Sequence, residues 1–373
     1  MIAIATLGTV GPTSMAVDDT ETVNGGVNIS IGFSDGSLAI YTLNKTAKTF
    51  TLQCKHAPSS NGAILAIDYA SPYLLTMTGI PLLSLYRLSH NEGGFLDTTL
   101  GAPNLLSSLQ SHTAYPPISL AIRPSSTSIV ASIAYAMPTW TSGWSVGLQE
   151  IRLTVEGAIV DSRVASASTK SMRPPYPPFN MKNPAPGIGD GTPWVPDTVG
   201  YIRIPSLTRP TSLSYNHPYL LSAHADNTLT LYMVTSNAQE LSIGAANRLW
   251  GHTSSVSGAH VGDRGKAVSV SAVGNELRVW ELEGGLSSST SRRRAAAGAA
   301  SVQVRPESSF ITEPKLQEAI RSLGSATPHP LDQDRKLDPS NVTEGWVAFD
   351  EERVVLLREK MQGAQALVVY DFS

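Results

Sequence analysis

Short apolar strands separated by turn residues recur along the whole chain. The clearest case is Ala267–Trp280, two strands joined by a Gly-Asn turn, and Leu220–Tyr232 and Ile29–Tyr41 follow the same plan. Their Gly-Asn, Asp-Asn and Asp-Gly dipeptides supply the positive φ that a tight hairpin needs. Weaker copies occur at Leu74–Tyr86 and Val354–Asp371. The pattern therefore predicts a series of similar β-hairpins.

A second signal precedes several of these hairpins, because strands end in Leu and His at Leu52–His56, Leu109–His112 and Leu249–His252. A four-stranded sheet cannot bury both faces alone, but it can do so between two neighbours in a ring. Six ordered copies can be outlined, at about Thr13–His56, Ile64–His112, Ile118–Ala165, Thr211–His252, Ser255–Pro306 and Gly345–Phe372. The repeats thus predict a closed ring of blades.

We predict an all-β fold, a β-propeller of six or seven four-stranded blades, with residues 1–373 in a single domain. The sixth copy ends after its third strand, whereas the chain begins with an unattached strand, Ile2–Gly8. We expect this N-terminal strand to complete the last blade. Ring closure would remove the sheet edges that otherwise template aggregation.

Two stretches interrupt the rhythm of the repeat. Residues 166–200 include Pro174-Pro-Tyr-Pro-Pro178 and further prolines, which exclude a regular strand or helix. We interpret this stretch as an extended loop over the propeller face, and the alternative is a polyproline-II-like segment presented to a partner. Residues 284–343 form an Arg-, Ala- and Ser-rich linker with a predicted strand at Ser301–Arg305 and a short helix at Pro314–Leu323.

Composition and charge exclude several classes of function. A formal net charge of −3 gives no electrostatic case for nucleic acid or an anionic membrane. The chain has no stretch of eighteen apolar residues, so we expect no membrane span. Cys54 is the only cysteine, which excludes an internal disulfide and fits a reducing compartment. We expect an intracellular protein, cytoplasmic or nuclear.

The chain carries no recognisable catalytic or metal-binding motif. It has no P-loop, no Gly-x-Ser-x-Gly elbow, no His-Glu-x-x-His and no cysteine pair. We interpret Asp18, Asp19 and Glu21 as solvated turn residues rather than as a metal site or an acid pair. The expected inner strands are mostly small and apolar, which argues against a hydrolase with carboxylates at a central channel. No catalytic residue, cofactor or metal is predicted.

Gly251-His252 lies 28 residues before Trp280, and at this point the chain resembles the WD-repeat family. In that family a His bonds both an Asp in the hairpin turn and a Ser or Thr on a strand. Val273 occupies the turn position in the fifth copy, so the resemblance implies that His252 lacks its carboxylate. The positions matched to the repeat are His112, His252, Trp280, Asp35, Tyr41, Tyr86, Tyr232 and Tyr370. No upstream His matches Asp35 or Asp226, and we expect degenerate networks.

Loops at one face of such a ring are the expected partner-binding surface, because aromatic and basic loop residues favour protein ligands. The candidates are Lys55, His56, Trp140, Trp144, Tyr176, Trp194, His224 and Asp226. Trp140 and Trp144 lie in an enlarged hairpin, where they either pack onto the propeller or form an apolar patch.

The blade end Arg278–Gly285, the Arg-rich linker and the ending Glu344–Phe372 resemble the C-terminal propeller of fungal F-box/WD-repeat proteins. The resemblance implies that the propeller captures substrate for a cullin-RING ubiquitin ligase while an F-box binds a Skp-type adaptor. This sequence shows no F-box-like helical segment, so we expect an adaptor contact only through an upstream F-box. The alternatives are a non-ligase scaffold in trafficking, RNA processing or signalling, and, less favoured, a propeller hydrolase.

Overall fold

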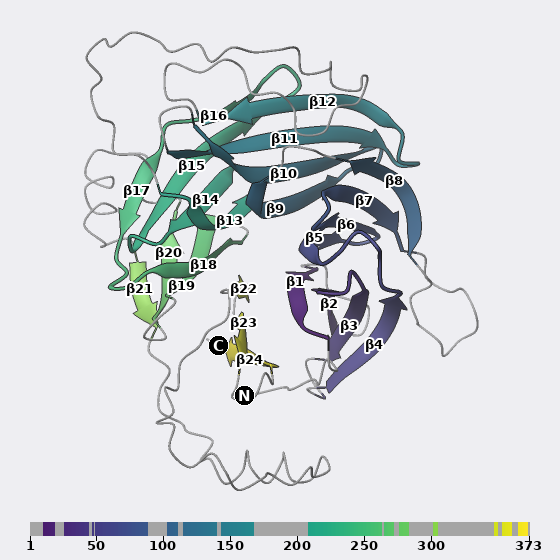
Figure 1. Ribbon diagram of the computed structural model, residues 1–373, viewed down its shortest axis with the longest axis horizontal. Coiled ribbons are helices and arrows are strands. Elements are labelled where there is room, and N and C mark those ends of the chain that lie inside the picture. Colours follow the sequence, from purple (N-terminus) through teal and green to yellow (C-terminus); the bar gives the residue numbers. More distant parts are fainter. Residues whose placement is uncertain are drawn as a thin grey trace, which may run out of the picture.

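The computed structural model describes β-strands arranged around a ring (Figure 1). It describes residues 10–18, 26–44, 47, 49–88, 103–110, 115–139, 143–167, 208–262, 265–271, 276–282, 301–304, 347–349, 353–359 and 365–371. Within each sheet the strands are antiparallel, and their order follows the sequence from the inner to the outer edge, except that β16 and β17 of one sheet both pair with β15. The β-hairpins that the sequence repeats predict are therefore the hairpins from which the blades are built.

Five blades have four or more strands each. Blade 1 contains β1 (Pro12–Val17), β2 (Gly26–Phe33), β3 (Leu38–Asn44) and β4 (Thr49–His56); blade 2 contains β5 (Ile64–Ala70), β6 (Tyr73–Thr78), β7 (Leu82–Arg87) and β8 (Asn104–Gln110); blade 3 contains β9 (Tyr115–Pro124), β10 (Ser128–Pro138), β11 (Trp144–Thr154) and β12 (Ile159–Ser166). Blade 4 contains β13 (Pro210–Asn216), β14 (Tyr219–His224), β15 (Thr228–Ser236), β16 (Leu241–Ile243) and β17 (Asn247–Trp250); blade 5 contains β18 (Val256–Val261), β19 (Lys266–Ser271), β20 (Leu277–Glu281) and β21 (Ser301–Val304).

The expected count of six or seven four-stranded blades is wrong, because the described residues form five. The sixth sheet has three strands, β22 (Val347–Phe349), β23 (Arg353–Glu359) and β24 (Gln365–Asp371). Its inner strand β22 contacts β18 and β19 on one side and β1 on the other, so this sheet lies between blades 5 and 1. The N-terminal strand expected to complete it lies outside the described residues.

The tight turns have the backbone geometry that their sequences predict. Gly36 in the Asp-Gly turn has φ 78°, and Asn227 in the Asp-Asn turn has φ 65°. Both values lie in the left-handed region, which Gly and Asn adopt more readily than other residues. These turns bring the second and third strands of blades 1 and 4 into register.

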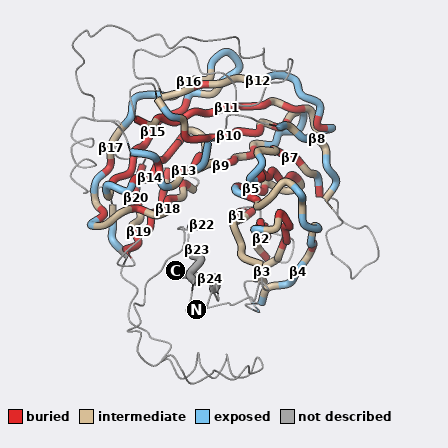
Figure 2. Tube along the Cα trace, in the orientation of Figure 1, coloured by how far each residue is buried: buried red, intermediate tan, exposed pale blue. Residues whose placement is uncertain are grey.

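The hydrophobic core lies between neighbouring blades. One cluster joins Leu75 and Met77 of blade 2 to Ile129 and Ile133 of blade 3, and another joins Leu221 of blade 4 to Trp280 and other residues of blade 5. Figure 2 shows burial along the middle strands, while the outer strands β4 and β12 are largely exposed or half-buried. Packing between blades therefore supplies most of the apolar burial.

Hydroxyl groups on the inner strands connect blade 1 to blade 2 and blade 4 to blade 5. Thr13 Oγ1 donates to Ile64 O (2.7 Å), and Thr211 Oγ1 donates to Val256 O in the same way (2.6 Å). Ser214 Oγ accepts a hydrogen bond from the backbone N–H of Val261 (2.9 Å). These bonds satisfy backbone groups that the sheets leave unpaired near the ring axis.

Candidate interaction face

Lys55 and His56 lie at the end of β4, where the chain passes to the inner strand of blade 2. Lys55 is exposed, and its assignment to a partner-binding face stays a prediction. The His56 ring is half-buried and lies edge-on to Tyr86, with ring centroids 5.8 Å apart. His56 thus packs against its own repeat and presents only part of its surface.

Trp144 begins β11 at the same end of the ring. It is half-buried, and the guanidinium of Arg209 lies 5.1 Å from the centre of its ring. Arg209 Nη2 also donates to Pro116 O (2.9 Å), so one cation links two strands of blade 3. The other aromatic candidates, Trp140, Tyr176 and Trp194, lie outside the described residues.

His224 is buried, so its assignment to the partner-binding face is wrong. It is 2% exposed at the end of β14, a strand covered on both faces. Its Nε2 lies 2.9 Å from Ser222 Oγ and 3.1 Å from Thr230 Oγ1. Burial lowers the pKa of the imidazole, which favours the neutral form. His224 therefore stiffens blade 4 from inside.

Asp226 does reach the surface, in the turn after β14. Its carboxylate accepts a hydrogen bond from Thr228 Oγ1 (2.6 Å) and pairs with Arg248. Burial alone would raise the pKa of this carboxyl, but the Thr228 hydroxyl and the Arg248 guanidinium hold it below its ordinary value. Asp226 is ionised at neutral pH and fixes the position of Arg248.

Trp250 was not among the sequence candidates, yet it is 47% exposed beside this ion pair. The Arg248 guanidinium lies 5.2 Å from the centre of its ring, a cation–π arrangement. Strand alternation on the outer strand β17 is the signal that finds it, because Leu249 is buried and its neighbours must point outward. We call Asp226, Arg248 and Trp250 the Trp250 patch.

The expectation that His252 lacks a carboxylate is wrong. Glu276, directly before β20, places Oε2 3.4 Å from His252 Nδ1. Trp280 Nε1 donates to Ser269 Oγ (2.7 Å), and Ser269 Oγ lies 2.5 Å from His252 Nε2. Since the indole can only donate, Ser269 gives its own proton to Nε2, and the Nδ1 proton faces Glu276. Blade 5 therefore has a carboxylate beside its His, supplied by a Glu three residues beyond the expected Val273.

The remaining positions matched to the repeat are Asp35, Tyr41, Tyr86, Tyr232, Tyr370 and His112. Asp35 accepts bonds from the N–H and hydroxyl of Ser37 (2.9 and 2.6 Å), which hold the pKa of its carboxyl below the ordinary value. Tyr232 is buried, while Tyr41 and Tyr86 are half-buried. Tyr370 pairs with Val354 in the last sheet, and His112 lies outside the described residues.

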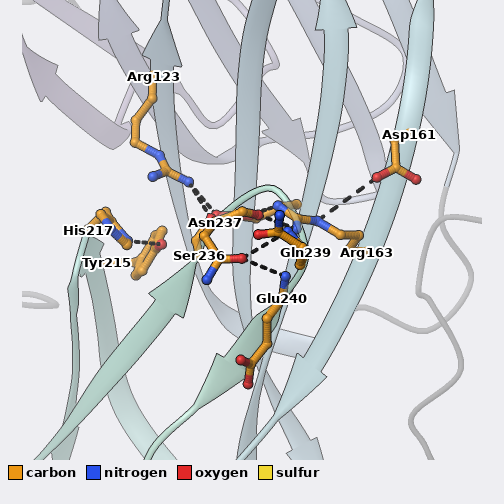
Figure 3. Close-up of polar contacts among 10 residues, drawn as sticks. Arg123, Asp161, Arg163, Tyr215, His217, Ser236, Asn237, Gln239 and Glu240 are labelled. Carbon is orange, nitrogen blue, oxygen red and sulfur yellow. Dashed lines mark hydrogen bonds and ion pairs between the residues drawn. The ribbon is translucent and has the colours of Figure 1, made fainter.

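A buried carboxylate, Glu150, joins blade 3 to blade 4 at the opposite end of the ring. Figure 3 shows Arg123, Arg163 and Ser236, the side chains that contact it. Glu150 is 2% exposed and pairs with Arg123 through one oxygen and with Arg163 Nη2 (3.2 Å) through the other. Ser236 at the end of β15 donates its hydroxyl to Glu150 Oε2 (2.7 Å), and Arg163 Nη1 donates to Asn237 O (2.5 Å). Glu150 is the one acidic residue in the mostly apolar run Trp144–Thr154, and this is the sequence signal that could have found it.

The Glu150 cluster has the geometry of an ion-pair network rather than of a catalytic group. The Ser236 hydroxyl donates directly to the carboxylate, with no imidazole positioned as a base between them. Tyr215 Oη and His217 Nδ1 lie 3.4 Å apart beside the cluster, and burial raises the pKa of the phenol and lowers that of the imidazole. Both groups therefore stay neutral at pH 7.

Asp18 is 2% exposed and hydrogen-bonded through its N–H to Asn28 O (2.9 Å), so its interpretation as a solvated turn residue is wrong. In the part of the chain that the structure describes, no three His, Cys, Asp or Glu side chains come close enough to hold a metal ion. The same residues include no helix long and apolar enough to cross a bilayer.

The model of one protein family matches residues 4–373, and its description is F-box protein pof12 beta-propeller. The chain belongs to this propeller family. No curated protein matches it. The solved structure of U3-55K is similar over 96% of this chain and 78% of that chain, with 11% sequence identity and a TM-score of 0.42, which supports no argument about function.

Blade 5 of this pof12-type propeller should make the stability of the fold depend on pH. Burial lowers the pKa of His252 from 6.5 to about 4, so between these values the unfolded chain binds more protons than the folded one. The stabilisation is complete above pH 6.5 and is lost as the pH falls toward 4. We expect the free energy of unfolding to drop by roughly 2 kcal/mol through His252 between pH 7 and pH 4.5.

Urea denaturation of the native chain and of His252→Asn at both pH values measures this drop. The variant should be less stable at pH 7 and should lose less stability on acidification. An unchanged pH dependence in the variant would show that His252 is not the group responsible.

Proposed function

We propose that this propeller captures a protein substrate for an F-box-type ubiquitin ligase. The observation that carries the proposal is the match to an F-box protein propeller across residues 4–373, which include all five blades. In this proposal a Skp-type adaptor binds an F-box in the parent polypeptide, and the ring holds the substrate. The protein acts inside the cell, in the cytoplasm or nucleus.

We place substrate capture at the Trp250 patch. Trp and Arg dominate the energetics of protein interfaces when an aromatic ring enters a desolvated site. Arg248 is already fixed by Asp226 and by a hydrogen bond from its Nε to Thr228 Oγ1 (3.1 Å), so binding costs little side-chain entropy. The patch also lies near Asn227, whose side chain donates to Thr253 O (3.3 Å) and fixes the neighbouring loop.

Binding rather than catalysis is part of the proposal. Propeller hydrolases would need carboxylates on several inner strands. On the inner strands β1, β5, β9, β13 and β18, the described acidic residue is Asp68, and its carboxylate accepts a hydrogen bond from Ile122 N–H (2.6 Å). That arrangement supports a packed inner ring.

Affinity purification of the complete gene product from cells with an inhibited proteasome tests this function. We expect mass spectrometry to find a Skp-type adaptor together with captured proteins. Trp250→Ala should keep the adaptor and reduce the captured proteins about tenfold, as expected for loss of a hot-spot residue.

Leu105→Ala is the matched control, because Leu105 is 51% exposed on the outer strand of blade 2 and lies away from the patch. It should capture the same proteins as the native chain. Absence of the adaptor, relative to a control propeller, would rule out the ligase role and leave a scaffold. Unchanged capture by Trp250→Ala would rule out the patch.

A further inference from the structure

Blades 4 and 5 each place a serine at the same point of the second strand. In each blade this Ser lies two residues after the cross-strand partner of an aromatic residue, Tyr232 in blade 4 and Trp280 in blade 5. The two serines are Ser222 and Ser269, and both are fully buried. Ser222 therefore holds in blade 4 the position that Ser269 holds in blade 5.

An imidazole meets this serine in both blades, but it comes from different parts of the chain. In blade 5 it belongs to His252, which precedes the inner strand, and its Nε2 lies 2.5 Å from Ser269 Oγ. In blade 4 it belongs to His224, on the same strand as Ser222, and its Nε2 lies 2.9 Å from Ser222 Oγ. His224 thus gives blade 4 the imidazole that no described residue before β13 supplies.

A carboxylate and an arginine accompany the imidazole in each blade. In blade 5, Glu276 Oε1 accepts a hydrogen bond from Arg278 Nε (2.7 Å), and the Arg278 side chain is 13% exposed. In blade 4, Asp226 pairs with Arg248, whose side chain is 32% exposed and lies against the ring of Trp250. The polar set of blade 4 therefore opens onto the Trp250 patch, whereas that of blade 5 is nearly closed.

The buried imidazole lies on the same face of blade 4 as this patch. Thr230 Oγ1 lies 3.1 Å from His224 Nε2, and Thr230 is the cross-strand partner of Arg248. Partners across strands share a face, and so do residues two apart on one strand, such as Arg248 and Trp250. A row of polar groups therefore runs from the interior of blade 4 to the exposed indole.

We propose that His224 is a positioning residue of the Trp250 patch, and that protonation of its imidazole releases Arg248 from the Trp250 ring by drawing Asp226 toward the new charge. A neutral imidazole leaves the carboxylate to Arg248 and to the Thr228 hydroxyl. A protonated imidazole is a second cation beside one carboxylate, and it repels the guanidinium. Substrate capture consequently weakens in acid. This inference rests on the proposed function, because it describes the regulation of the same site.

Burial and neighbouring charges set the pH of this change. His224 is 2% exposed, and burial lowers the pKa of its imidazole. Asp226 and the backbone of Thr208 raise that pKa, whereas Arg248 lowers it, and these two side chains are the charged groups described beside it. Departure of Arg248 therefore raises the pKa, so acid favours the released arrangement. The change lies below about pH 6.5, the ordinary pKa of His, and the patch is intact at neutral pH.

Acrylamide quenching of Trp250 fluorescence between pH 8 and pH 5 tests the proposal. The signal of Trp250 is the difference between the native 373-residue chain and Trp250→Phe. At neutral pH the guanidinium of Arg248 lies over the indole ring. We expect the quenching constant of Trp250 to rise about twofold as the pH falls, because a second face of the ring becomes accessible. Far-UV circular dichroism at each pH verifies that the blades stay folded.

Three variants separate the imidazole from the rest of the fold. His224→Gln keeps an amide that can bond the Ser222 and Thr230 hydroxyls but does not titrate, so its quenching constant should stay at the neutral-pH value of the native chain. Asp226→Asn removes the carboxylate, so its quenching constant should be high at every pH. His56→Gln is the matched control, because it removes a half-buried His in blade 1, and it should keep the native pH response.

A pH response that persists in His224→Gln, or that is missing from the native chain, would overturn the proposal. If His224→Gln does not fold, a native pH response in Asp226→Asn would overturn it, since Asp226 lies in an exposed turn. In affinity purification, a wash at pH 6 should remove captured proteins from the native chain and leave them on His224→Gln. If neither protein captures anything at pH 7, substrate capture fails, and the quenching result still decides the role of His224.

Discussion

Replacing Glu150 with Ala will lower the free energy of unfolding by about 3 kcal/mol, because it leaves two guanidinium groups without their carboxylate. Glu150 is 2% exposed, while the side chains of Arg123 and Arg163 are 33% and 21% exposed. Full burial of the arginines would place the loss toward about 5 kcal/mol, and their partial exposure to water reduces it. The variant also removes the acceptor of the Ser236 hydroxyl, which weakens the contact between blades 3 and 4.

Urea denaturation at pH 7 measures this loss, and Asp161→Ala is the matched control. The Asp161 carboxylate lies 4.0 Å from Arg163 Nε, but its side chain is 52% exposed. Exposed pairs of this kind contribute less than about 1 kcal/mol. Glu150→Gln should fall between the two, since it keeps an acceptor and loses the charge. Equal stabilities of Glu150→Ala and Asp161→Ala would contradict the role given to the buried carboxylate.

The blade plan could be predicted from sequence because each hairpin is a local signal. The run Ala267–Trp280 contains nearly all of β19 and β20, and the strand expected at Ser301–Arg305 is β21. Alternating apolar residues and turn dipeptides act over a few residues, so they are visible in the chain itself. The blade count failed where the copy is incomplete, since the last sheet has three described strands.

The side-chain networks could not be predicted in the same way. Ser236 and Glu150 are 86 residues apart, and no local pattern links a strand of blade 3 to the end of β15. Glu276 was missed because the family resemblance placed Val273 at the carboxylate position. His224 was assigned to the surface because its own stretch of sequence does not show that it is buried. Neighbouring blades cover both faces of its strand, and the side chain is 2% exposed. Such contacts form only when the blades pack together in the ring, so the repeat within one blade does not reveal them.

Trp280→Ala should cost about 3–5 kcal/mol of unfolding free energy, the range for removing a large buried aromatic side chain. Trp280 is 1% exposed and packs in the core between blades 4 and 5. Its loss leaves a cavity and also removes the N–H that orients Ser269 toward His252. Trp280→Phe leaves a smaller cavity than Trp280→Ala, because it keeps much of the aromatic contact while it loses the donor and part of the indole volume.

Urea denaturation of the three proteins at pH 7 orders them as native, Trp280→Phe and Trp280→Ala, from most to least stable. Trp250→Ala is the control for loss of a tryptophan, and its 47% exposure predicts a cost below about 1 kcal/mol. If Trp280→Phe matched the native stability, neither the indole N–H bond to Ser269 nor the lost part of the ring would contribute, and the phenyl packing alone would explain the position. If Trp280→Ala and Trp250→Ala were equally stable, the core between blades 4 and 5 would not depend on Trp280. The Trp280 indole thus both fills the space between blades 4 and 5 and orients the Ser269 hydroxyl toward the His252 imidazole.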